Sequence, residues 1–315
     1  MEKHLSPIIK PDALMVLKQT TDLTLIDVRT GPNALEIYQK GHLQGALFVD
    51  LEQQLAHKSD NAANGGRHPL PSVEQFVLIL NQLGINENSH VIVYDDKNGA
   101  NAAARFWWML RAVGHQKVQV IDGGMQAAVE AGFPTSDKKE VIAPKMPYKL
   151  GDKLDDKLSD KLGDKLGDKL GDKLGDEISD KINAWVLPLV DLKTVEKATH
   201  DDNLLIIDVR DTARYEGRVE PIDLIAGHIP NAVNVPFSEN LDADGFYLAP
   251  SVLKAKYEAV FGSKASEQVI VHCGSGVTAC HTLLAVAYAG MEIPNLYTGS
   301  WSEWSRNDLP IATEL

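Results

Sequence analysis

Residues 269–282 read Val-Ile-Val-His-Cys-Gly-Ser-Gly-Val-Thr-Ala-Cys-His-Thr, and they join a strand pattern to a helix pattern. The apolar β-formers 269–271 predict the end of a buried strand. The run from Thr278 to Tyr288 has good helix formers with apolar spacing, which predicts a helix. Gly274 and Gly276 allow the tight turn between them. Strand, short loop and helix in this order form the repeating unit of parallel α/β folds.

Cys273 lies in the loop of this unit. Consecutive backbone N–H groups and a helix N-terminus can converge there on the sulfur, which lowers the pKa of a thiol from its reference of about 8.5. The alternative is an inert buried cysteine. The glycines and the strand–loop–helix context favour a nucleophilic thiolate.

The sequence contains an internal repeat, which appears as matching blocks in the same order. Leu-Thr-Leu-Ile-Asp-Val-Arg at 23–29 matches Leu-Leu-Ile-Ile-Asp-Val-Arg at 204–210. Three further blocks follow in the same order: 41–46 matches 227–232, 90–95 matches 268–273, and 122–125 matches 298–301. Strands alternating with helical segments predict a duplicated α/β domain, each copy a mainly parallel sheet flanked by helices. We expect domains at 1–148 and 183–315, joined by residues 149–182.

The two copies differ in chemistry, because Asp95 stands in the first where Cys273 stands in the second. We therefore expect a single active site. The second copy carries the nucleophile, and the first copy supplies walls of an interdomain cleft, a common place for ligands.

The bridge 149–182 repeats Gly-Asp-Lys-Leu every four residues. On a helix the leucines would drift by ~40° per repeat, and each glycine costs about 1 kcal/mol relative to alanine. We expect a solvated, partly helical linker. The alternative is an amphipathic helix that packs on the domains or on another chain.

Composition excludes several classes of protein. The chain has 315 residues, a net charge of −13 and two cysteines. The charge disfavours nucleic acid and anionic membranes as partners. Two cysteines spaced seven apart give no disulfide framework and no zinc site, and they favour a reducing, cytoplasmic compartment. We expect no secretory signal, no membrane span, no metal and no cofactor.

On these motifs, the chain resembles the two-domain sulfurtransferases of the rhodanese superfamily over almost all of its length outside the bridge. The marks are Asp-Val-Arg with Gly-His-Ile-Pro-Asn-Ala, the Tyr-Asp block followed by Arg-Phe-Trp-Trp at 105–108, and Gly-Ser-Trp at 299–301. The resemblance implies two tandem rhodanese-like domains, of which the first lacks the catalytic cysteine. The loop 273–278 resembles that of 3-mercaptopyruvate sulfurtransferases; thiosulfate-preferring relatives carry basic residues where this loop has Gly274 and Ser275.

This resemblance implies a reaction with an anionic sulfur donor. Cys273 would take sulfur from 3-mercaptopyruvate as a persulfide, release pyruvate, and pass the sulfur to cyanide or to a thiol such as that of a thioredoxin-like protein. Two alternatives stay open: thiosulfate as the donor, or a persulfide relay protein with little small-molecule turnover. Phosphatase chemistry is excluded, because the phosphate-clamping arginine it requires is Ala279 here.

A proton relay is expected for mercaptopyruvate, whose sulfur leaves behind an enolate of pyruvate. A hydroxyl linked to an imidazole and a carboxylate can deliver that proton. Ser275 is the candidate hydroxyl. By resemblance, His68 and Glu52 are its partners, with Asp50 close by; Glu52 replaces the family's aspartate. An exposed loop histidine is the alternative for His68.

The donor carboxylate requires an arginine clamp, since a guanidinium can bind it through two hydrogen bonds. By resemblance, Arg214 matches the first family arginine, and Asp223 stands where the second is expected. Arg218 is the candidate replacement, and a weaker clamp is the alternative. Further residues are expected to line the substrate site, to make structural ion pairs, or to pack in the core. These are Gly274, Gly276, Val277 and Thr278 for the site, Arg29, Arg105 and Arg210 for ion pairs, and His42, His228 and Cys280 for the core, with a resolving thiol as the alternative for Cys280.

Overall fold

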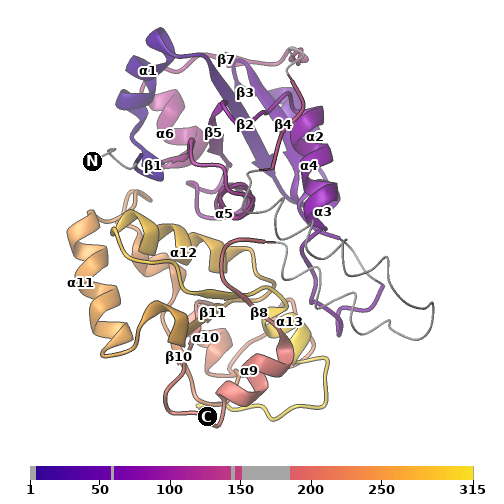
Figure 1. Ribbon diagram of the computed structural model, residues 1–315, viewed down its shortest axis with the longest axis vertical. Helices are drawn as coiled ribbons and strands as arrows, with labels where there is room; N and C mark the ends of the chain where they lie inside the picture. Colours follow the sequence, from indigo (N-terminus) through magenta and orange to yellow (C-terminus); the bar gives the residue numbers. More distant parts are fainter. Residues whose placement is uncertain (1–4, 58–59, 143–145, 151–184, 315) are drawn as a thin grey trace, which may run out of the picture.

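The computed structural model of the chain describes residues 5–57, 60–142, 146–150 and 185–314. Within these residues lie two five-stranded sheets, in which all neighbouring strands run parallel. The first domain, with β1 to β7, and the second domain, with β8 to α13, stack one above the other in Figure 1. The predicted duplicated α/β fold is confirmed.

The first domain has the strand order β1-β6-β5-β2-β4. Its strands are β1 (Ile8–Ile9), β2 (Leu23–Arg29), β4 (Ala46–Asp50), β5 (His90–Tyr94) and β6 (Val118–Ile121), and β3 (His42–Leu43) pairs separately with β7 (Thr135–Ser136). Its helices are α1 (Pro11–Thr20), α2 (Ala34–Lys40), α3 (Leu51–Gln54), α4 (Val73–Gln82), α5 (Ala102–Ala112) and α6 (Gly124–Glu130). The apolar run of β5 suits a central strand that is covered on both faces.

The second domain has the strand order β8-β12-β11-β9-β10, position for position the order of the first. Its strands are β8 (Leu189–Val190), β9 (Leu205–Asp208), β10 (Ala232–Asn234), β11 (Val269–His272) and β12 (Asn295–Tyr297). Its helices are α9 (Leu192–Ala198), α10 (Thr212–Tyr215), α11 (Pro250–Phe261), α12 (Thr278–Tyr288) and α13 (Ser300–Trp304), with 3₁₀ turns η1 (Phe237–Asn240) and η2 (Ser266–Gln268). No helix in the described part of the chain is long and apolar enough to cross a membrane.

The repeated Asp-Val-Arg motif makes the same ion pair in both domains. Arg29 Nε lies 2.8 Å from Asp27, and Arg210 Nη2 lies 2.6 Å from Asp208. Each guanidinium also donates to the carbonyl of the glycine that opens the following Gly-His motif. The predicted structural role of both arginines is confirmed.

The repeated Gly-His motif is equally structural. The His42 ring stacks on Tyr38 at 4.0 Å, and the His228 ring stacks on Tyr215 at 3.7 Å. Each imidazole Nδ1 also contacts the carbonyl oxygen of the tyrosine on which the ring stacks. Both histidines thereby tie a helix to the strand that follows it.

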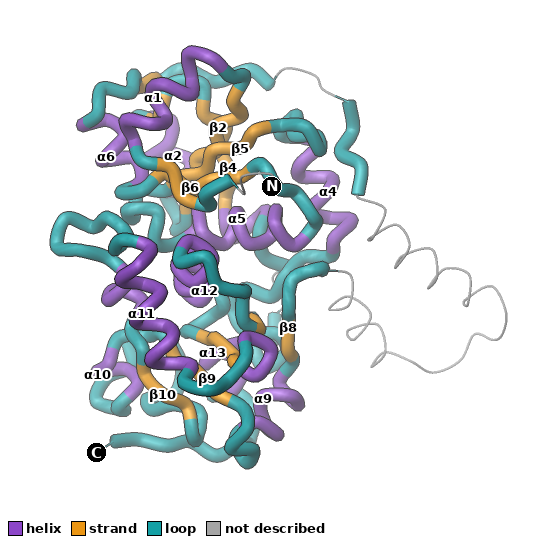
Figure 2. Tube along the Cα trace, turned by 60° about the vertical axis from the view of Figure 1, so that its left-hand side comes forward, coloured by secondary structure: helices purple, strands orange, loops and turns teal. Residues whose placement is uncertain are grey.

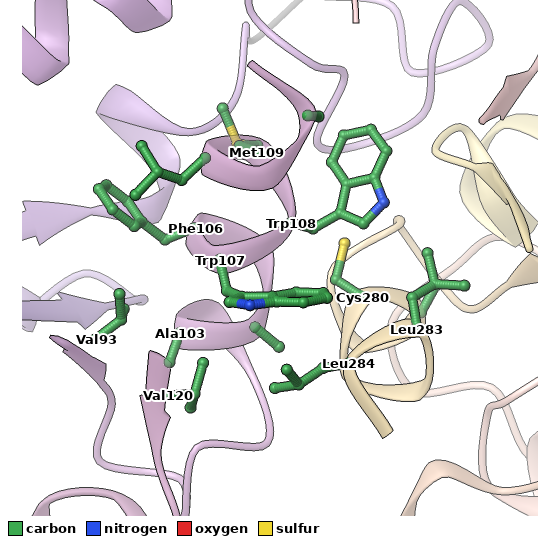
Figure 3. Packing of buried hydrophobic residues seen from close by; sticks show 14 of the residues in the cluster. Val93, Ala103, Phe106, Trp107, Trp108, Met109, Val120, Cys280, Leu283 and Leu284 are labelled. Atoms are coloured by element: carbon green, nitrogen blue, oxygen red, sulfur yellow. The ribbon is translucent and has the colours of Figure 1, made fainter. Parts of the chain in front are cut away.

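The two domains share one hydrophobic core. Helices α5 and α12 lie side by side between the sheets in Figures 1 and 2. Figure 3 shows Trp107 and Trp108 of α5 beside Cys280 and Leu284 of α12, all buried members of one cluster. Because α5 packs against its own sheet and against α12, its side chains are buried nearly all the way round. The domains cannot separate without exposing this surface to water.

The segments on either side of residues 151–184 both reach this core. Tyr148 is buried, and the Trp185 ring lies 5.9 Å from the Phe76 ring and 6.0 Å from the Trp108 ring, both of the first domain. The predicted linker 149–182, with both interpretations of its conformation, lies outside the described residues except for Lys149 and Leu150.

Candidate active site

The Cys273 loop connects the end of β11 to the start of α12, at the edge of the sheet where open α/β folds bind ligands. Cys273 is 2% exposed, and the Gly276 N–H donates to its Sγ at 3.2 Å. Gly276 has φ +75°, and a Cβ there would lie 2.6 Å from the carbonyl oxygen of Thr298. Only glycine fits this turn, which aims a backbone N–H at the sulfur.

The equivalent loop of the first domain holds an anion of its own. The Asp95 carboxylate, 1% exposed, accepts four backbone N–H bonds, from Lys97, Gly99, Asn101 and Ala103 at 2.9, 2.8, 3.1 and 3.1 Å. Converging N–H groups of this kind form an anion-binding concavity. In the second domain Cys273 takes the equivalent place after β11, and within the described residues its Sγ accepts one backbone N–H, that of Gly276.

Cys273 opens into a pocket of about 580 Å³ between the two domains. The lining residues come from both halves of the chain: Thr30, Leu51, Glu52, Arg67, His68, Asn101, Arg214, Ile222, Cys273, Gly274, Ser275, Val277 and Thr278. The structure therefore brings together Cys273, Ser275, His68 and Glu52, as well as most of the residues predicted to line the site. An interdomain cleft with a single cysteine is what the asymmetric repeat predicts.

A continuous line of hydrogen-bonding groups runs from Ser275 to a carboxylate. Ser275 Oγ lies 2.7 Å from His68 Nδ1, and His68 Nε2 lies 2.9 Å from Glu52 Oε1. An ionised carboxylate only accepts, so Nε2 carries the proton and Nδ1 of the neutral ring accepts from the Ser275 hydroxyl. Burial lowers the pKa of His68, and its effect outweighs that of Glu52, which raises the pKa. The imidazole therefore stays neutral to a lower pH, with Nδ1 able to accept a proton.

Helix α13 of the second domain holds the His68 segment in place. Glu303 Oε1 accepts the Gly65 N–H at 2.7 Å, and Ser302 Oγ accepts the Arg67 N–H at 3.0 Å. A Cβ on Gly66, which has φ +78°, would lie 2.3 Å from the Gly299 carbonyl oxygen. This close backbone approach fixes His68 against the cysteine loop.

The carboxylate at the other end of the line is positioned by a helix cap. Asp50 accepts the N–H groups of Glu52 and Gln53 at 2.7 and 3.1 Å and so begins α3. Asp50 is thereby engaged with the backbone, which leaves Glu52 as the carboxylate that reaches His68. Capping of this kind is the common use of aspartate at a helix start.

Two guanidinium groups lie directly over Gly274. A Cβ built on Gly274 would lie 3.1 Å from Arg67 Nη2 and 3.6 Å from Arg214 Nη2. Arg214 Nη2 donates to Glu220 Oε1 at 2.7 Å. Burial acts to raise the pKa of Glu220, but the hydrogen bonds that this carboxylate accepts, from Arg214 above all, lower the pKa overall. The pocket therefore contains a thiol, a hydroxyl–imidazole–carboxylate relay and two cations within one space.

A rhodanese-like domain model matches residues 10–131 and 191–307, one match for each structural repeat and more than half of the chain. The chain belongs to the rhodanese-like domain family. Both matched segments end within the two domains seen in the structure, and the bridge lies outside them.

Relatives of this rhodanese-like protein span nearly its full length. It is 35% identical over 301 residues to the "Probable 3-mercaptopyruvate sulfurtransferase" of Pseudomonas aeruginosa, covering 93% of each chain. It is also 35% identical over 287 residues to a Mycobacterium tuberculosis protein provisionally named thiosulfate sulfurtransferase SseB, covering 90% of this chain and 88% of that one. The crystal structure of SseA from Escherichia coli, titled as a 3-mercaptopyruvate sulfotransferase with the rhodanese fold, matches 95% of this chain and 100% of that one, with 28% identity and a TM-score of 0.68.

Two predicted site residues lie outside the pocket lining of this rhodanese-like site. Arg218 is 63% exposed and pairs with Glu216, so it does not replace the missing second arginine. Gly276 contributes its N–H to the sulfur instead of lining the space. Arg67 is the arginine that sequence reasoning missed, although it directly precedes His68.

Arg105 differs from the prediction of a structural ion pair, which is wrong. The residue is fully buried, and its partners are carbonyl oxygens: Gly276 at 3.1 Å and His68 at 3.0 Å, with Leu55 at 3.5 Å. No carboxylate in the described part of the chain pairs with it, and burial lowers its pKa. One rigid guanidinium thereby joins the cysteine loop of the second domain to the His68 segment of the first.

Cys280 belongs to the interface core. It is fully buried on α12, its Sγ donates to the Gly276 carbonyl at 3.3 Å, and burial raises its pKa to about 12. These features favour packing over a role as a resolving thiol. Within the described residues, no group of three or more His, Cys, Asp or Glu side chains is arranged to hold a metal ion.

Proposed function

We propose that this chain is a sulfurtransferase that moves sulfur from 3-mercaptopyruvate, through a persulfide on Cys273, to a thiol or to cyanide. The observation that carries the proposal is the line Glu52–His68–Ser275, which ends in the pocket that contains Cys273. A mercaptopyruvate donor needs a proton for its leaving enolate, and this relay can move one. The names of the Pseudomonas and Escherichia relatives support the same donor.

The relay takes one proton from Cys273 and returns the same number to the product. The Cys273 thiol proton passes through Ser275 to Nδ1 of His68, and Glu52 stabilises the resulting imidazolium. The thiolate attacks the donor sulfur, so that an S–S bond forms while the C–S bond breaks and leaves its electron pair on the pyruvate enolate. The proton returns through Ser275 to the enolate carbon, and pyruvate leaves.

In the second half-reaction an acceptor thiolate attacks the outer sulfur of the persulfide. The S–S bond breaks and the Cys273 thiolate is regenerated. A thiol of a thioredoxin-like protein is the proposed acceptor, in a reducing, cytoplasmic setting. The free state of Cys273 and Cys280 fits such a setting.

The test combines steady-state rates with the intact mass of the donor-treated protein. We expect faster turnover of 3-mercaptopyruvate than of thiosulfate, and one added sulfur atom that is lost on treatment with a thiol. Cys273→Ser should abolish both turnover and the mass increase, whereas the control Cys280→Ala should retain them. Sulfur transfer by the Cys273→Ser protein would refute the proposal.

Thiosulfate is the second candidate donor. The two guanidinium groups over Gly274 and the name of the mycobacterial relative favour it. A higher kcat/KM for thiosulfate in the same assay would select this candidate and remove the need for the relay. Formation of a persulfide on Cys273 without steady-state turnover of either donor would instead indicate a persulfide relay protein.

A further inference from the structure

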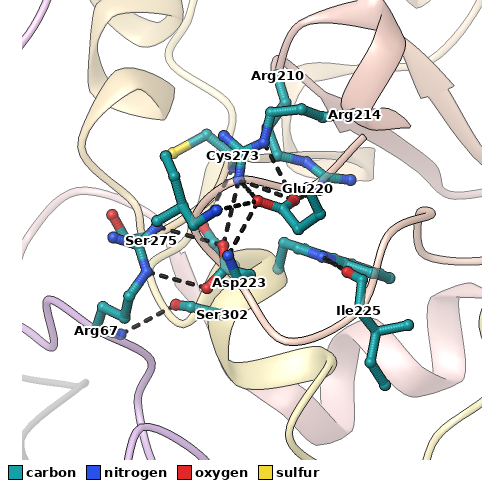
Figure 4. A network of polar contacts seen from close by, with 12 residues as sticks. Arg67, Arg210, Arg214, Glu220, Asp223, Ile225, Cys273, Ser275 and Ser302 are labelled. Carbon is teal, nitrogen blue, oxygen red and sulfur yellow. Dashed lines mark hydrogen bonds and ion pairs between the residues drawn. The ribbon is translucent and has the colours of Figure 1, made fainter. Parts of the chain in front are cut away.

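Asp223 is a buried carboxylate enclosed by arginines from both domains. Its side chain has no exposed surface, and it accepts from Arg67 Nε at 3.0 Å, Arg214 Nη2 at 3.3 Å and Arg306 Nη1 at 3.1 Å. Figure 4 shows Arg67 reaching it from the first domain, while Arg214 approaches from the second. A buried carboxylate is stable only with such compensation, because removal from water penalises an unpaired charge.

Arg67 and Arg214 also face the pocket, where each keeps free donors. Both residues line it, with 26% and 12% of their side chains exposed. Across the described residues, Nη1 of Arg67 and Nη1 of Arg214 make no hydrogen bond. Since both guanidiniums lie over Gly274, an anionic group beside Cys273 would meet one from each domain.

The absence of a side chain at Gly274 provides this space. The backbone of Gly274 is not in the left-handed region, so its conformation does not require glycine. A side chain there would point at the guanidiniums of Arg67 and Arg214. The loop thus leaves the position after the nucleophile empty, and the cations come from elsewhere in the chain.

The network as a whole carries one net positive charge. It contains four arginines, Arg67, Arg210, Arg214 and Arg306, and three carboxylates, Asp208, Glu220 and Asp223. The other charged residues near Cys273 are Glu52 and Arg105, one of each sign. Without Asp223 the network would carry two positive charges.

We propose that Asp223 is a specificity-determining residue, which reduces the charge of the Arg67–Arg214 clamp so that the site takes a sulfur donor with one negative charge in preference to a dianion. The inference rests on the proposed transfer of sulfur from an anionic donor to Cys273. In a partly desolvated site, a ligand charge that the network does not balance is costly. A mercapto-monocarboxylate matches the single net charge, whereas thiosulfate carries one negative charge too many.

The first test is Asp223→Asn, which removes the charge and preserves the shape. We expect the ratio of kcat/KM for thiosulfate to kcat/KM for 3-mercaptopyruvate to rise by about tenfold or more, the equivalent of one charge interaction of modest strength. Glu216→Gln, which removes an acidic charge beside exposed Arg218, should leave the ratio unchanged. A folded Asp223→Asn protein with the wild-type ratio would overturn the inference.

A double variant separates charge from geometry. Arg67→Gln in the Asp223→Asn background restores one net positive charge, so the donor ratio should return toward the wild-type value although binding weakens for both donors. A ratio that stays high would assign the effect to altered shape and overturn the inference.

A further measurement needs no change at Asp223. Pyruvate and sulfate are compared as protectants of Cys273 against alkylation by iodoacetamide. Pyruvate should protect at a concentration at least about tenfold lower, and equal protection by the dianion would overturn the inference. Absence of sulfur uptake from either donor would refute the proposed function and the inference with it, whereas uptake with an unchanged ratio would refute the inference alone.

Discussion

Nδ1 of His68, in the first domain, lies 2.7 Å from Oγ of Ser275, in the cysteine loop of the second. Neither domain alone contains both halves of this hydrogen bond. Helix α13 sets its geometry through Glu303 and Ser302, and Arg105 contributes by donating to the carbonyl oxygens of Gly276 and His68. The chemistry of the site therefore depends on how the domains dock, and four predictions follow from this dependence.

Ser275→Ala should lower kcat for 3-mercaptopyruvate by about 10²-fold or more, the size of a typical proton-transfer contribution. Thiosulfate turnover should fall much less, because both donors require deprotonation of Cys273, whereas sulfite, unlike the enolate, leaves without a proton from the relay. Steady-state kinetics with both donors give the comparison. Equal losses for the two donors would contradict delivery of the proton from Ser275 to the enolate.

The acid limb of kcat for 3-mercaptopyruvate should lie below the ordinary histidine pKa of about 6.5. Burial lowers the pKa of His68, and the nearby Arg105 and Arg67 lower it as well, so the ring stays neutral and basic to a lower pH. Glu52 raises this pKa, so Glu52→Gln should move the limb to still lower pH while reducing kcat. A pH–rate profile of both proteins checks this, and an unmoved limb in Glu52→Gln would contradict it.

Arg105→Lys should reduce kcat for both donors alike, by about tenfold. A lysine ammonium cannot reproduce the fork that bonds the Gly276 and His68 carbonyls together. The free energy of unfolding should fall by about 3 kcal/mol, for two charge-assisted hydrogen bonds at about 1.5 kcal/mol each. Denaturant unfolding measures this. Arg111→Lys on the same helix is the control, since Arg111 bonds only near the end of α5.

Glu303→Ala and Glu303→Gln form a matched pair. The alanine variant loses the acceptor of the Gly65 N–H and should lower kcat for 3-mercaptopyruvate by about tenfold, whereas the glutamine variant keeps an acceptor and the rate. Burial raises the pKa of Glu303 in the folded protein above its ordinary value. The free energy of unfolding therefore falls as the pH rises from that ordinary value to the pKa in the folded protein. Glu303→Gln should therefore be at least as stable as the wild type at pH 7 in thermal unfolding. A slow glutamine variant would contradict the positioning role.

The fold could largely be predicted, because each block of the internal repeat is a contiguous sequence segment. Each Asp-Val-Arg block is a strand with its own ion pair, and the matching order of blocks predicts matching sheets. Cys273 and Ser275 could be predicted for the same reason, since one short loop contains both. Glu52 and His68 were indicated only by resemblance, because no local pattern distinguishes them from other polar residues.

The remaining site residues depend on docking, which has no local signature. Arg67 reaches Asp223 only because α13 holds the segment before His68 against the second domain. Arg105 resembles any helix arginine in the sequence, and its carbonyl partners come from two distant segments and are brought to it by the α5–α12 interface. Sequence spacing does not report which surface of one domain meets the other.

The shared core between α5 and α12 makes this enzyme a natural candidate for fragment complementation. Two polypeptides, one with the first sheet and one with the second, would each lack half of the relay and half of the clamp. Their activity would appear only on reassociation, so sulfur transfer itself would report the affinity of the halves. The two domains therefore depend on each other for activity as the subunits of an obligate heterodimer do, although one polypeptide contains both.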